Sequence, residues 1–440
     1  MTSTPWEATA RVLKRASFGA TGTDIDAAHA QGITTWVAAT VSSETFAAAA
    51  AEARHTAPDV PMPAPRDHSA TREAKRAANA AQRKAAEQVI AWWVERIWTT
   101  TTPVVEKITF GWHEHWATSV KKVKAGRLML AQNLTLREHA TGSFTTMATA
   151  LTRDPALLHW LDAQKNTAKA PNENLARELM ELFTLGQGHG YTETDVKEAA
   201  RALTGWRITD DGTATFDAKR HDQGTKTVLA VTGNLGVEEV LAAILARPEH
   251  PIHLATRWWH RLASPTEPRA DTLGRLLAAY GSGRDNGALL RAILTDPAFA
   301  AAPATNSLVV TPIEWTLGLV RALKVPLTDA TRKHVREALT QLGQLPMVPP
   351  DVSGWPSGRA WLSTAAATVR LQAADHLVTA GDLSAVADAA ATPTARSDAA
   401  LHLLGLARVG TRTAAALAAA KTEPRALVAT LALSPEYLVT

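Results

Sequence analysis

The sequence contains no cysteine among its 440 residues. This absence excludes disulfides, thiolate nucleophiles and metal sites built on cysteine sulfur. No apolar run approaches the roughly 20 residues that a membrane-spanning helix needs. The first 22 residues hold neither an apolar leader core nor a twin arginine. We therefore expect a soluble, cytoplasmic protein, or an exported one if a leader has been removed.

Several familiar catalytic motifs are missing as well. The chain has no GxSxG elbow, no phosphate-binding P-loop and no HExxH segment, so the usual marks of serine hydrolases, nucleotide-binding enzymes and zinc proteases are lacking. Basic residues exceed acidic ones only slightly, 46 to 42. The densest basic runs, in 72–84 and 121–127, are not interleaved with aromatic residues. They indicate solvated helix faces and give no strong nucleic-acid signal.

Alanine and leucine are abundant, which favours helix, and β-branched residues are fewer. We predict a mainly α-helical protein with one large helical body over residues 5–380. A proline-rich irregular loop interrupts this body at 55–70. A small β-hairpin element is predicted near 206–232, with a tight turn at Asp211-Gly212 and a third strand from Lys226 to Val231. Residues 381–440 form an alanine-rich helical extension.

The most polar predicted helix covers residues 172–186. At about 100° per residue, Glu173, Arg177 and Glu181 fall on the same arc, and Asn174 and Glu178 lie beside them. One interpretation is a solvated amphipathic face with i,i+4 ion pairs. The other is a cleft-lining cluster, in which crowded carboxylates raise one another's pKa or hold a cation.

The cleft interpretation gives catalytic roles to Arg177, Glu178 and Glu181 and substrate contacts to Asn172 and Asn174. We expect both glutamates to be partly withdrawn from solvent and to contact Arg177 or the histidines at 113 and 115. Arg177→Ala should then cost roughly 3–5 kcal/mol, against less than about 1 kcal/mol on a solvated face.

The segment His113-Glu114-His115 lies in a tryptophan-rich helix that is predicted to begin at Pro103. Residues two apart in a helix point about 200° apart, so the two imidazoles can share an ion only if the helix ends or distorts. Under that condition they would hold a divalent cofactor such as zinc, manganese or iron, completed by a carboxylate of Glu178, Glu181 or Asp222. Otherwise we expect His115 to pack with Trp112 and hydrogen-bond, and His113 to pair with an acidic neighbour.

Two further segments carry candidate residues. His221-Asp222 lies in a turn of the predicted β element, where the pair would orient or polarise another group. In the proline-stiffened loop 348–361, Trp355 and Trp361 either form a stacking platform for a sugar or base or pack a domain edge. The catalytic candidates are His113, His115, Arg177, Glu178, Glu181, His221 and Asp222, and the substrate-binding candidates are Asn172, Asn174, Trp206, Trp355 and Arg359.

These stretches resemble one family, the domain-of-unknown-function-1800 (DUF1800) family, in the same order over roughly residues 6–380. Residues 172–186, followed by Gly190-Tyr191-Thr192, Asp195 and 201–206, look like its central block. Residues 112–119 are similar to its tryptophan–histidine block, although Glu114 and Trp116 stand where Asn and Phe are expected.

Three shorter stretches complete the resemblance. Residues 221–224 resemble the family's His-Asp turn, with Gln223 where an aromatic is usual. Residues 354–361 match its C-terminal loop, and 15–21 resemble its N-terminal start. The resemblance implies a bacterial protein, from a family often exported and often encoded beside a companion protein with a phosphatase-like fold. No activity is established for the family.

Two functions fit these observations. In the first, the polar helix, both histidines and His221-Asp222 converge on one cleft of an enzyme that carries out hydrolysis or elimination on a polar substrate. In the second, the same groups form a buried polar network in a non-catalytic binding or assembly protein. An open polar cleft containing the histidines and carboxylates favours the enzyme, whereas a closed, fully paired network favours the scaffold.

Overall fold

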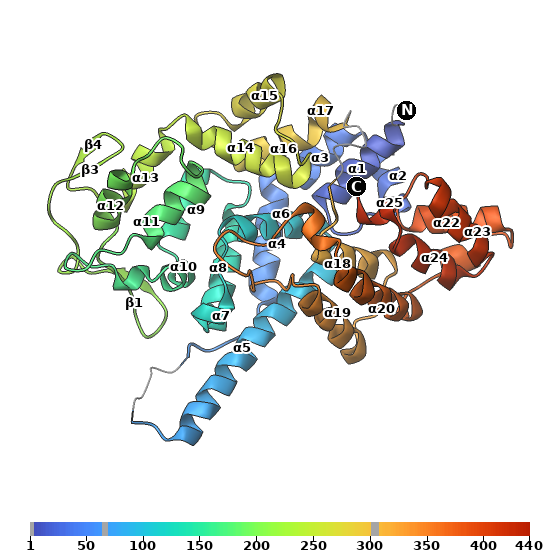
Figure 1. The fold of residues 1–440 in the computed structure, drawn as a ribbon, viewed down its shortest axis with the longest axis horizontal. Coiled ribbons are helices and arrows are strands. Elements are labelled where there is room, and N and C mark those ends of the chain that lie inside the picture. The colour runs from blue at the N-terminus through green and yellow to red at the C-terminus, as the bar shows by residue number, and fades with distance from the viewer. Residues whose placement is uncertain (1–3, 64–68, 301–307) are drawn as a thin grey trace.

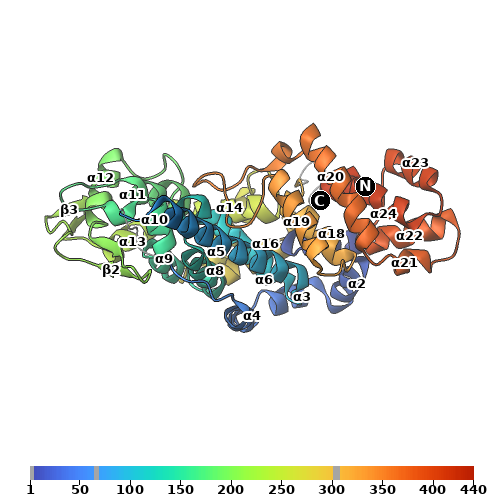
Figure 2. The same ribbon diagram turned by 90° about the horizontal axis from the view of Figure 1, so that it is seen from below.

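The computed structural model describes residues 4–63, 69–300 and 308–440. Helices account for 64% of the chain, which confirms the mainly α-helical class. The molecule is elongated, with two small hairpins at one end and the C-terminal helices at the other (Figure 1). The two termini lie near each other, on the side of the C-terminal helices (Figure 2).

The first half of the chain is helical as far as residue 165. Its helices are α1 (Pro5–Ala16), α2 (Gly22–Gln31), α3 (Ile33–Thr40), α4 (Ser43–Thr56), α5 (Arg72–Thr99), α6 (Pro103–His115), α7 (Val120–Val123), α8 (Gly126–His139), α9 (Phe144–Thr152), α10 (Pro155–Trp160) and the 3-10 helix η1 (Ala163–Lys165). Between α4 and α5 lies the predicted irregular loop, of which residues 64–68 are outside the described ranges.

Helix α5 leaves the body as a long arm (Figure 1). Its first three turns, residues 72–84, are almost entirely exposed, because they are polar or alanine. Its last turns carry Val89, Trp93 and Ile97, each fully buried. The change from polar to apolar composition along one helix therefore sets the point at which it joins the core.

The predicted β element consists of two separate hairpins. Strand β1 (Trp206–Ile208) pairs with β2 (Ala214–Phe216) across the predicted turn at Asp211-Gly212. The predicted third strand does not join them. Strand β3 (Lys226–Val228) pairs with β4 (Val231–Gly233) instead. The chain reverses there because Leu229 and Ala230 both adopt left-handed conformations, with φ of 50° and 68°, as a tight hairpin turn requires.

The central block contains a change of helix type. Helix α11 (Asn174–Glu178) continues directly into the π-helix η2 (Leu179–Thr184). Helix α12 (Glu193–Ala202) begins with the predicted capping box, since Thr192 and Asp195 bond each other's backbone N–H. The helices that follow the hairpins are α13 (Val237–Leu245), α14 (Glu249–Leu262), α15 (Ala270–Tyr280), α16 (Asn286–Thr295) and α17 (Pro297–Ala300).

The remaining helices complete the other end of the molecule. They are α18 (Pro312–Ala322), α19 (Asp329–Gln341), the 3-10 helix η4 (Gly358–Trp361), α20 (Thr364–Ala380), α21 (Ser384–Ala387), α22 (Pro393–Leu403), α23 (Thr411–Ala420), α24 (Pro424–Ala432) and α25 (Pro435–Leu438). Helix α24 packs on α20, and α22 packs on α2. Within the described ranges, no helix combines the length and the low polarity that crossing a bilayer demands.

Two large hydrophobic cores meet at helix α6. Trp112 and Trp116 belong to the core formed mainly with α8–α16. Phe110, on another side of the same helix, belongs to the core formed with α5 and α18–α24. Helix α6 is therefore buried almost all round, and every residue from Val104 to His113 is buried. Polar groups on α6 must find partners inside the protein.

Candidate functional site

His113 lies in the protein interior and is 2% exposed. Its Nε2 accepts a hydrogen bond from the backbone N–H of Met347 at 3.2 Å, and its ring packs against Trp93, Phe110 and Trp355. Burial lowers the pKa of His113 to about 3, so the ring is neutral and can accept this bond. The prediction of an acidic partner for His113 is wrong. Its side chain instead accepts a hydrogen bond from the loop before residue 348 and so connects this loop to α6.

His115 is one of three histidines, two buried and one partly buried, that bond the end of the π-helix η2. The last carbonyls of a helix have no partner within it, and here three consecutive ones accept from imidazole N–H groups. The bonds run from His253 Nε2 to Leu182 O (3.1 Å), from His115 Nε2 to Phe183 O (3.0 Å) and from His250 Nδ1 to Thr184 O (3.2 Å). His115 also packs edge-on against Trp112, so the structural role expected for it is confirmed.

All three of these histidines are held neutral. Burial lowers the pKa of His250 to about 3 and that of His253 to about 4. Burial likewise holds the pKa of His115 well below its usual range. A neutral imidazole has one N–H to donate, and each carbonyl takes it. The arrangement is a helix cap made of side chains from α6 and α14.

The prediction that His113 and His115 share a metal ion is therefore wrong. Helix α6 runs without a break to His115, so the two rings point to different sides, one toward Met347 and the other toward Phe183. In the part of the chain that the structure describes, no three His, Asp or Glu side chains are arranged to hold an ion. The regular helix decides this, because its geometry separates residues two apart.

Arg177 sits in a surface network of carboxylates. Its guanidinium bonds Glu173 at 3.0 Å, Glu181 at 3.1 Å and both oxygens of Glu193 at 2.8 and 2.9 Å. The side chain of Arg177 is 31% exposed and that of Glu193 is 67% exposed. Burial, followed by the nearby charge of Glu181, raises the pKa of Glu178. The expected contact between Glu181 and Arg177 is confirmed, and both glutamates are partly withdrawn from solvent.

The expected contacts between this network and the histidines at 113 and 115 are wrong. No hydrogen bond or ion pair joins either imidazole to Arg177, Glu178 or Glu181 within the described ranges. Because Arg177 is 31% exposed and Glu193 is 67% exposed, the network is closer to the solvated face than to a buried cluster, and the smaller of the two predicted losses for Arg177→Ala is the one to expect.

His221 and Asp222 face different partners. His221 Nδ1 lies 3.0 Å from the carbonyl of Thr204 and its Nε2 lies 3.5 Å from the ammonium of Lys226. The carboxylate of Asp222 bonds Arg201 at 2.7 Å, and this guanidinium lowers the pKa of Asp222. The pair thus anchors the second hairpin to the end of α12.

The remaining candidates of the central block make local contacts. The side-chain carbonyl of Asn172 accepts the backbone N–H of Asn174 at 3.0 Å, and the backbone N–H of Asn172 donates to Asn166 at 2.8 Å. Trp206 on β1 is half-buried, with the guanidinium of Arg153 5.2 Å from its ring centre. The predicted catalytic and substrate-binding residues therefore lie in several separate groups and do not line one cleft. Their roles in a reaction stay predictions.

The C-terminal loop divides its two candidates between core and surface. Trp355 is 6% exposed and stacks on Phe110, with ring centres 5.3 Å apart, and Trp361 is 5% exposed. The stacking-platform interpretation is therefore wrong, and the packing alternative is the one observed. Arg359, in contrast, is exposed and lies in the wall of a large cavity.

This cavity, which we name the basic pocket, has a volume of about 570 Å³. It is lined by segments far apart in sequence: α1, α6, α14, α18, the loop 356–359 and the end of the chain. Five of its side chains are cationic and two are acidic: Lys14, Arg15, Lys107, Arg261 and Arg359 against Glu114 and Glu314. Among these side chains the cations therefore outnumber the carboxylates by three, five minus two.

Both carboxylates of the basic pocket are already paired. Glu314 binds Lys107, and Glu114 binds Arg261. Burial alone would raise the pKa of Glu314, but the Lys107 ammonium holds it below its ordinary value. Burial lowers the pKa of Arg261 to about 10. Each of the two acidic side chains is thus engaged by one cation, and neither is available to neutralise a third.

Among the described residues, neither Lys14 nor Arg359 forms an ion pair with an acidic side chain, whereas Arg15 is held by backbone groups. Arg15 is 4% exposed and donates to the carbonyls of Ala263 and Thr440. Burial, followed by the charge of Arg11, lowers the pKa of Arg15 to about 9. Lys14 is half-buried, with its ammonium 5.5 Å from the ring centre of Tyr437. Burial lowers the pKa of Lys14 to about 7.

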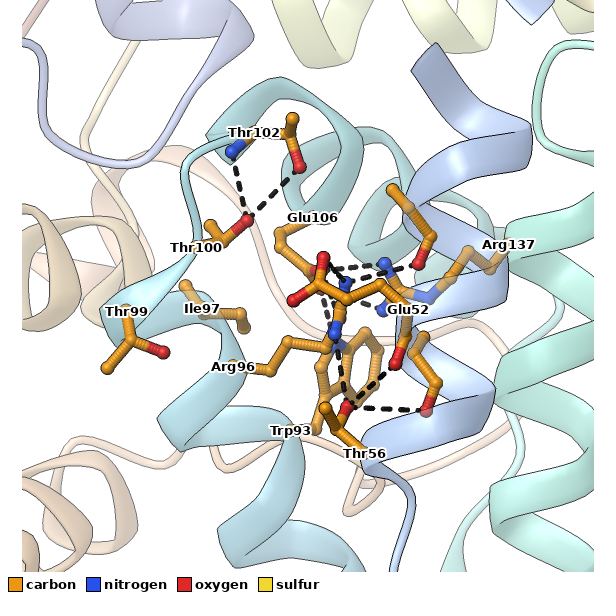
Figure 3. Close-up of polar contacts among 12 residues, drawn as sticks. Glu52, Thr56, Trp93, Arg96, Ile97, Thr99, Thr100, Thr102, Glu106 and Arg137 are labelled. Carbon is orange, nitrogen blue, oxygen red and sulfur yellow. Dashed lines mark hydrogen bonds and ion pairs between the residues drawn. The ribbon is translucent and has the colours of Figure 1, made fainter. Parts of the chain in front are cut away.

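A second buried charged region, the Glu106 cluster, is also built on α6 (Figure 3). We define it as Glu106, Arg96, Arg137 and Trp93. Glu106 is fully buried and accepts two bonds from Arg137 at 2.6 and 2.8 Å, one from Arg96 at 2.7 Å and one from Trp93 at 3.1 Å. Arg96 continues to the carbonyl of Ala49 at 3.1 Å. The cluster joins α4, α5, α6 and α8.

Sequence reasoning missed most of the basic pocket. Its lining comes from the stretches that resemble the family's N-terminal start, tryptophan–histidine block and C-terminal loop. Arg15, Glu114 and Arg359 lie in those stretches, but only Arg359 was a candidate. The available signal was that each of these three family-like stretches contains a charged residue. Spacing could not reveal that they meet, because hundreds of residues separate them.

Comparisons with known proteins agree with the resemblance seen in the sequence. No curated protein and no solved structure matches the chain. A family model described as "Protein of unknown function (DUF1800)" matches residues 11–439. The match includes all the segments that line the basic pocket up to Val439 and runs through the alanine-rich C-terminal helices. Because it covers nearly the whole chain, the protein belongs to the DUF1800 family.

Proposed function

We propose that the protein binds a small anionic molecule, carrying a carboxylate or phosphate group, in the basic pocket. The observation that carries this proposal is the excess of three positive charges around one concave cavity of about 570 Å³. Cavities of this size hold small metabolites. Lys14 is partly withdrawn from water and has no acidic side chain paired with it, which is costly for its charged form, and a bound anion offsets that cost.

The architecture of the pocket supports a ligand site over a purely structural network. A structural network satisfies its charges internally, as the Glu106 cluster does together with Glu52, whose carboxylate bonds Arg96 at 3.2 Å. In the basic pocket the two acids are used by Lys107 and Arg261, and Arg359 is exposed at the wall with no ion pair among the described residues. An exposed guanidinium at such a position presents a planar fork that fits carboxylate and phosphate oxygens.

The enzyme hypothesis, hydrolysis or elimination on a polar substrate, attaches to this pocket and no longer to the histidines. Glu114, Glu314 and His260 supply the acid–base groups of its lining. A cytoplasmic location and a companion protein encoded nearby stay predictions. The alternative of a non-catalytic binding protein uses the same pocket, so one binding experiment addresses both.

The test is titration with inorganic phosphate, sulfate and citrate at constant ionic strength, followed by thermal melting and calorimetry. We expect these anions to raise the melting temperature, and chloride at the same ionic strength not to. Arg359→Gln should weaken binding roughly tenfold, as expected for loss of one charge-assisted contact. Arg127→Gln is the matched control, because Arg127 is an equally exposed arginine outside the pocket. Equal melting temperatures in chloride, phosphate and citrate would overturn the proposal.

A further inference from the structure

We propose that Lys14 is a reactive amine that forms a Schiff base with the carbonyl group of an anionic aldehyde or keto acid bound in the basic pocket. This inference rests on the proposed anion-binding function and deepens it, because it assigns the ligand a second functional group. The argument depends on where the amine of Lys14 lies and on what surrounds it.

Lys14 projects from the last turn of α1 into the lining of the pocket. Its stem passes Gly405, where a Cβ would meet Lys14 Cε at 3.2 Å. The amine ends near the ring of Tyr437 on α25. Glycine on one side and an aromatic ring on the other therefore fix the direction of the side chain, without a carboxylate among the described residues to hold its proton.

The second lysine of the pocket provides an internal contrast. Lys107 is ion-paired with Glu314 and lies 5.4 Å from the ring centre of Phe18. Burial lowers the pKa of Lys107 as well, but its carboxylate partner opposes this shift and favours the protonated ammonium, which has no lone pair with which to attack a carbonyl. Lys14 lacks such a partner and is withdrawn from water, and both conditions favour the neutral, nucleophilic amine. The lowered pKa of Lys14, about 7, agrees with this contrast.

The charged groups around the cavity suit an anionic carbonyl compound. Arg15 on α1, Lys107 on α6, Arg261 on α14 and Arg359 in the C-terminal loop would attract the carboxylate or phosphate of the ligand. Glu114 on α6, His260 and Glu314 are the acid–base groups facing the same space. A ligand held through its anionic end would present its carbonyl to the remaining amine, which raises the effective concentration of the reacting pair.

The reaction balances without a further reactant. The lone pair of the Lys14 nitrogen adds to the carbonyl carbon, and one amine proton passes to the carbonyl oxygen to give a carbinolamine. The C–O bond then breaks, and the hydroxyl group leaves as water with the second amine proton. The product is a C=N bond between Lys14 and the ligand. This linkage withdraws electrons from the neighbouring carbon, which is the chemistry that a lyase on a carbonyl substrate requires.

The experiment traps the linkage in the full-length protein at pH 7. The protein is incubated with glyoxylate and cyanoborohydride, which reduces the imine and leaves a carboxymethyl group on the amine, and the modified lysines are quantified by peptide mass spectrometry. We expect Lys14 to be modified at least roughly tenfold faster than the exposed Lys121, because a far larger fraction of its amine is unprotonated. Lys107 should be modified more slowly than Lys14.

Phosphate competition separates this inference from the proposed function. Fast modification of Lys14 that phosphate suppresses supports both. Modification of Lys14 no faster than that of Lys121, while phosphate still raises the melting temperature, overturns the Schiff base and leaves anion binding standing. If Lys14 is modified fast, phosphate does not slow the modification, and phosphate does not raise the melting temperature, the anion site is overturned. Lys14→Arg, checked for folding by circular dichroism, should abolish labelling at position 14 while Lys121 labelling continues.

Discussion

The Glu106 cluster and the basic pocket are both built on α6, yet their charges are arranged in opposite ways. In the Glu106 cluster a single carboxylate receives four hydrogen bonds from two arginines and a tryptophan, with no exposure of Glu106 or Arg137. In the basic pocket five cations share two carboxylates around open space. A closed set of matched charges supports the fold, whereas an unmatched set that faces a cavity calls for a ligand.

The largest loss of stability should come from removing one arginine of the Glu106 cluster. Arg137→Ala leaves the buried carboxylate of Glu106 with half of its bonds, so we expect a loss of roughly 3–5 kcal/mol in the free energy of unfolding. Urea denaturation measures it. Arg54→Ala is the control, because the Arg54–Glu138 pair is about half-exposed and should contribute less than about 1 kcal/mol. Equal losses in the two variants would erase the contrast between buried and exposed pairs.

Lys14 of the basic pocket should make the free energy of unfolding depend on pH between neutral and alkaline values. The pKa of Lys14 is about 7 when folded and about 10.4 when unfolded. Between these values the unfolded chain binds the proton and the folded protein does not, so stability rises with pH. Relative to Lys14→Met, the wild type should gain roughly 2–4 kcal/mol between pH 7 and pH 10. Parallel stability curves for the two proteins, measured by urea denaturation at several pH values, would show that Lys14 titrates normally.

The neutral histidines that cap the π-helix η2 should make the free energy of unfolding depend on pH in the acid range. His253 has a folded pKa of about 4 against about 6.5 when unfolded, so stability falls as pH drops from about 6.5 to about 4. His253→Gln keeps an N–H to donate to Leu182 but does not titrate. We expect it to remove roughly 2–3 kcal/mol of the acid-induced loss, measured by denaturation at pH 7 and pH 4. If the difference in stability between pH 7 and pH 4 is the same in the variant and the wild type, groups other than His253 cause the acid-induced loss.

The smallest effect concerns the surface network of Arg177. Its guanidinium is 31% exposed and its partner Glu193 is 67% exposed, so solvent screens the ion pairs. We expect Arg177→Ala to lower the free energy of unfolding by about 1 kcal/mol. Thermal melting gives the comparison with Arg137→Ala. A loss as large as that of Arg137→Ala would show that the ion pairs of Arg177 behave like those of the buried Glu106 cluster.

The sequence by itself determined the helices, their starts and the family. Alanine and leucine content predicted the α-helical class, and Thr192 with Asp195 predicted the start of α12, because these signals act within a few residues. Helical geometry also gave the correct condition for a metal shared by His113 and His115, which the unbroken helix does not meet. The hairpin turn at Leu229-Ala230 escaped prediction, since neither residue is typical of left-handed backbone.

Only the tertiary structure decided which polar residues are buried, paired or open. A glutamate in α6 reads the same in sequence whether it is Glu106, surrounded by arginines, or Glu114, at the wall of a pocket. Local patterns give the face of a helix but not what packs against it. Lys14, Arg261 and Arg359 meet because α1, α14 and the C-terminal loop converge on α6, and that convergence depends on the packing of two cores over the whole chain.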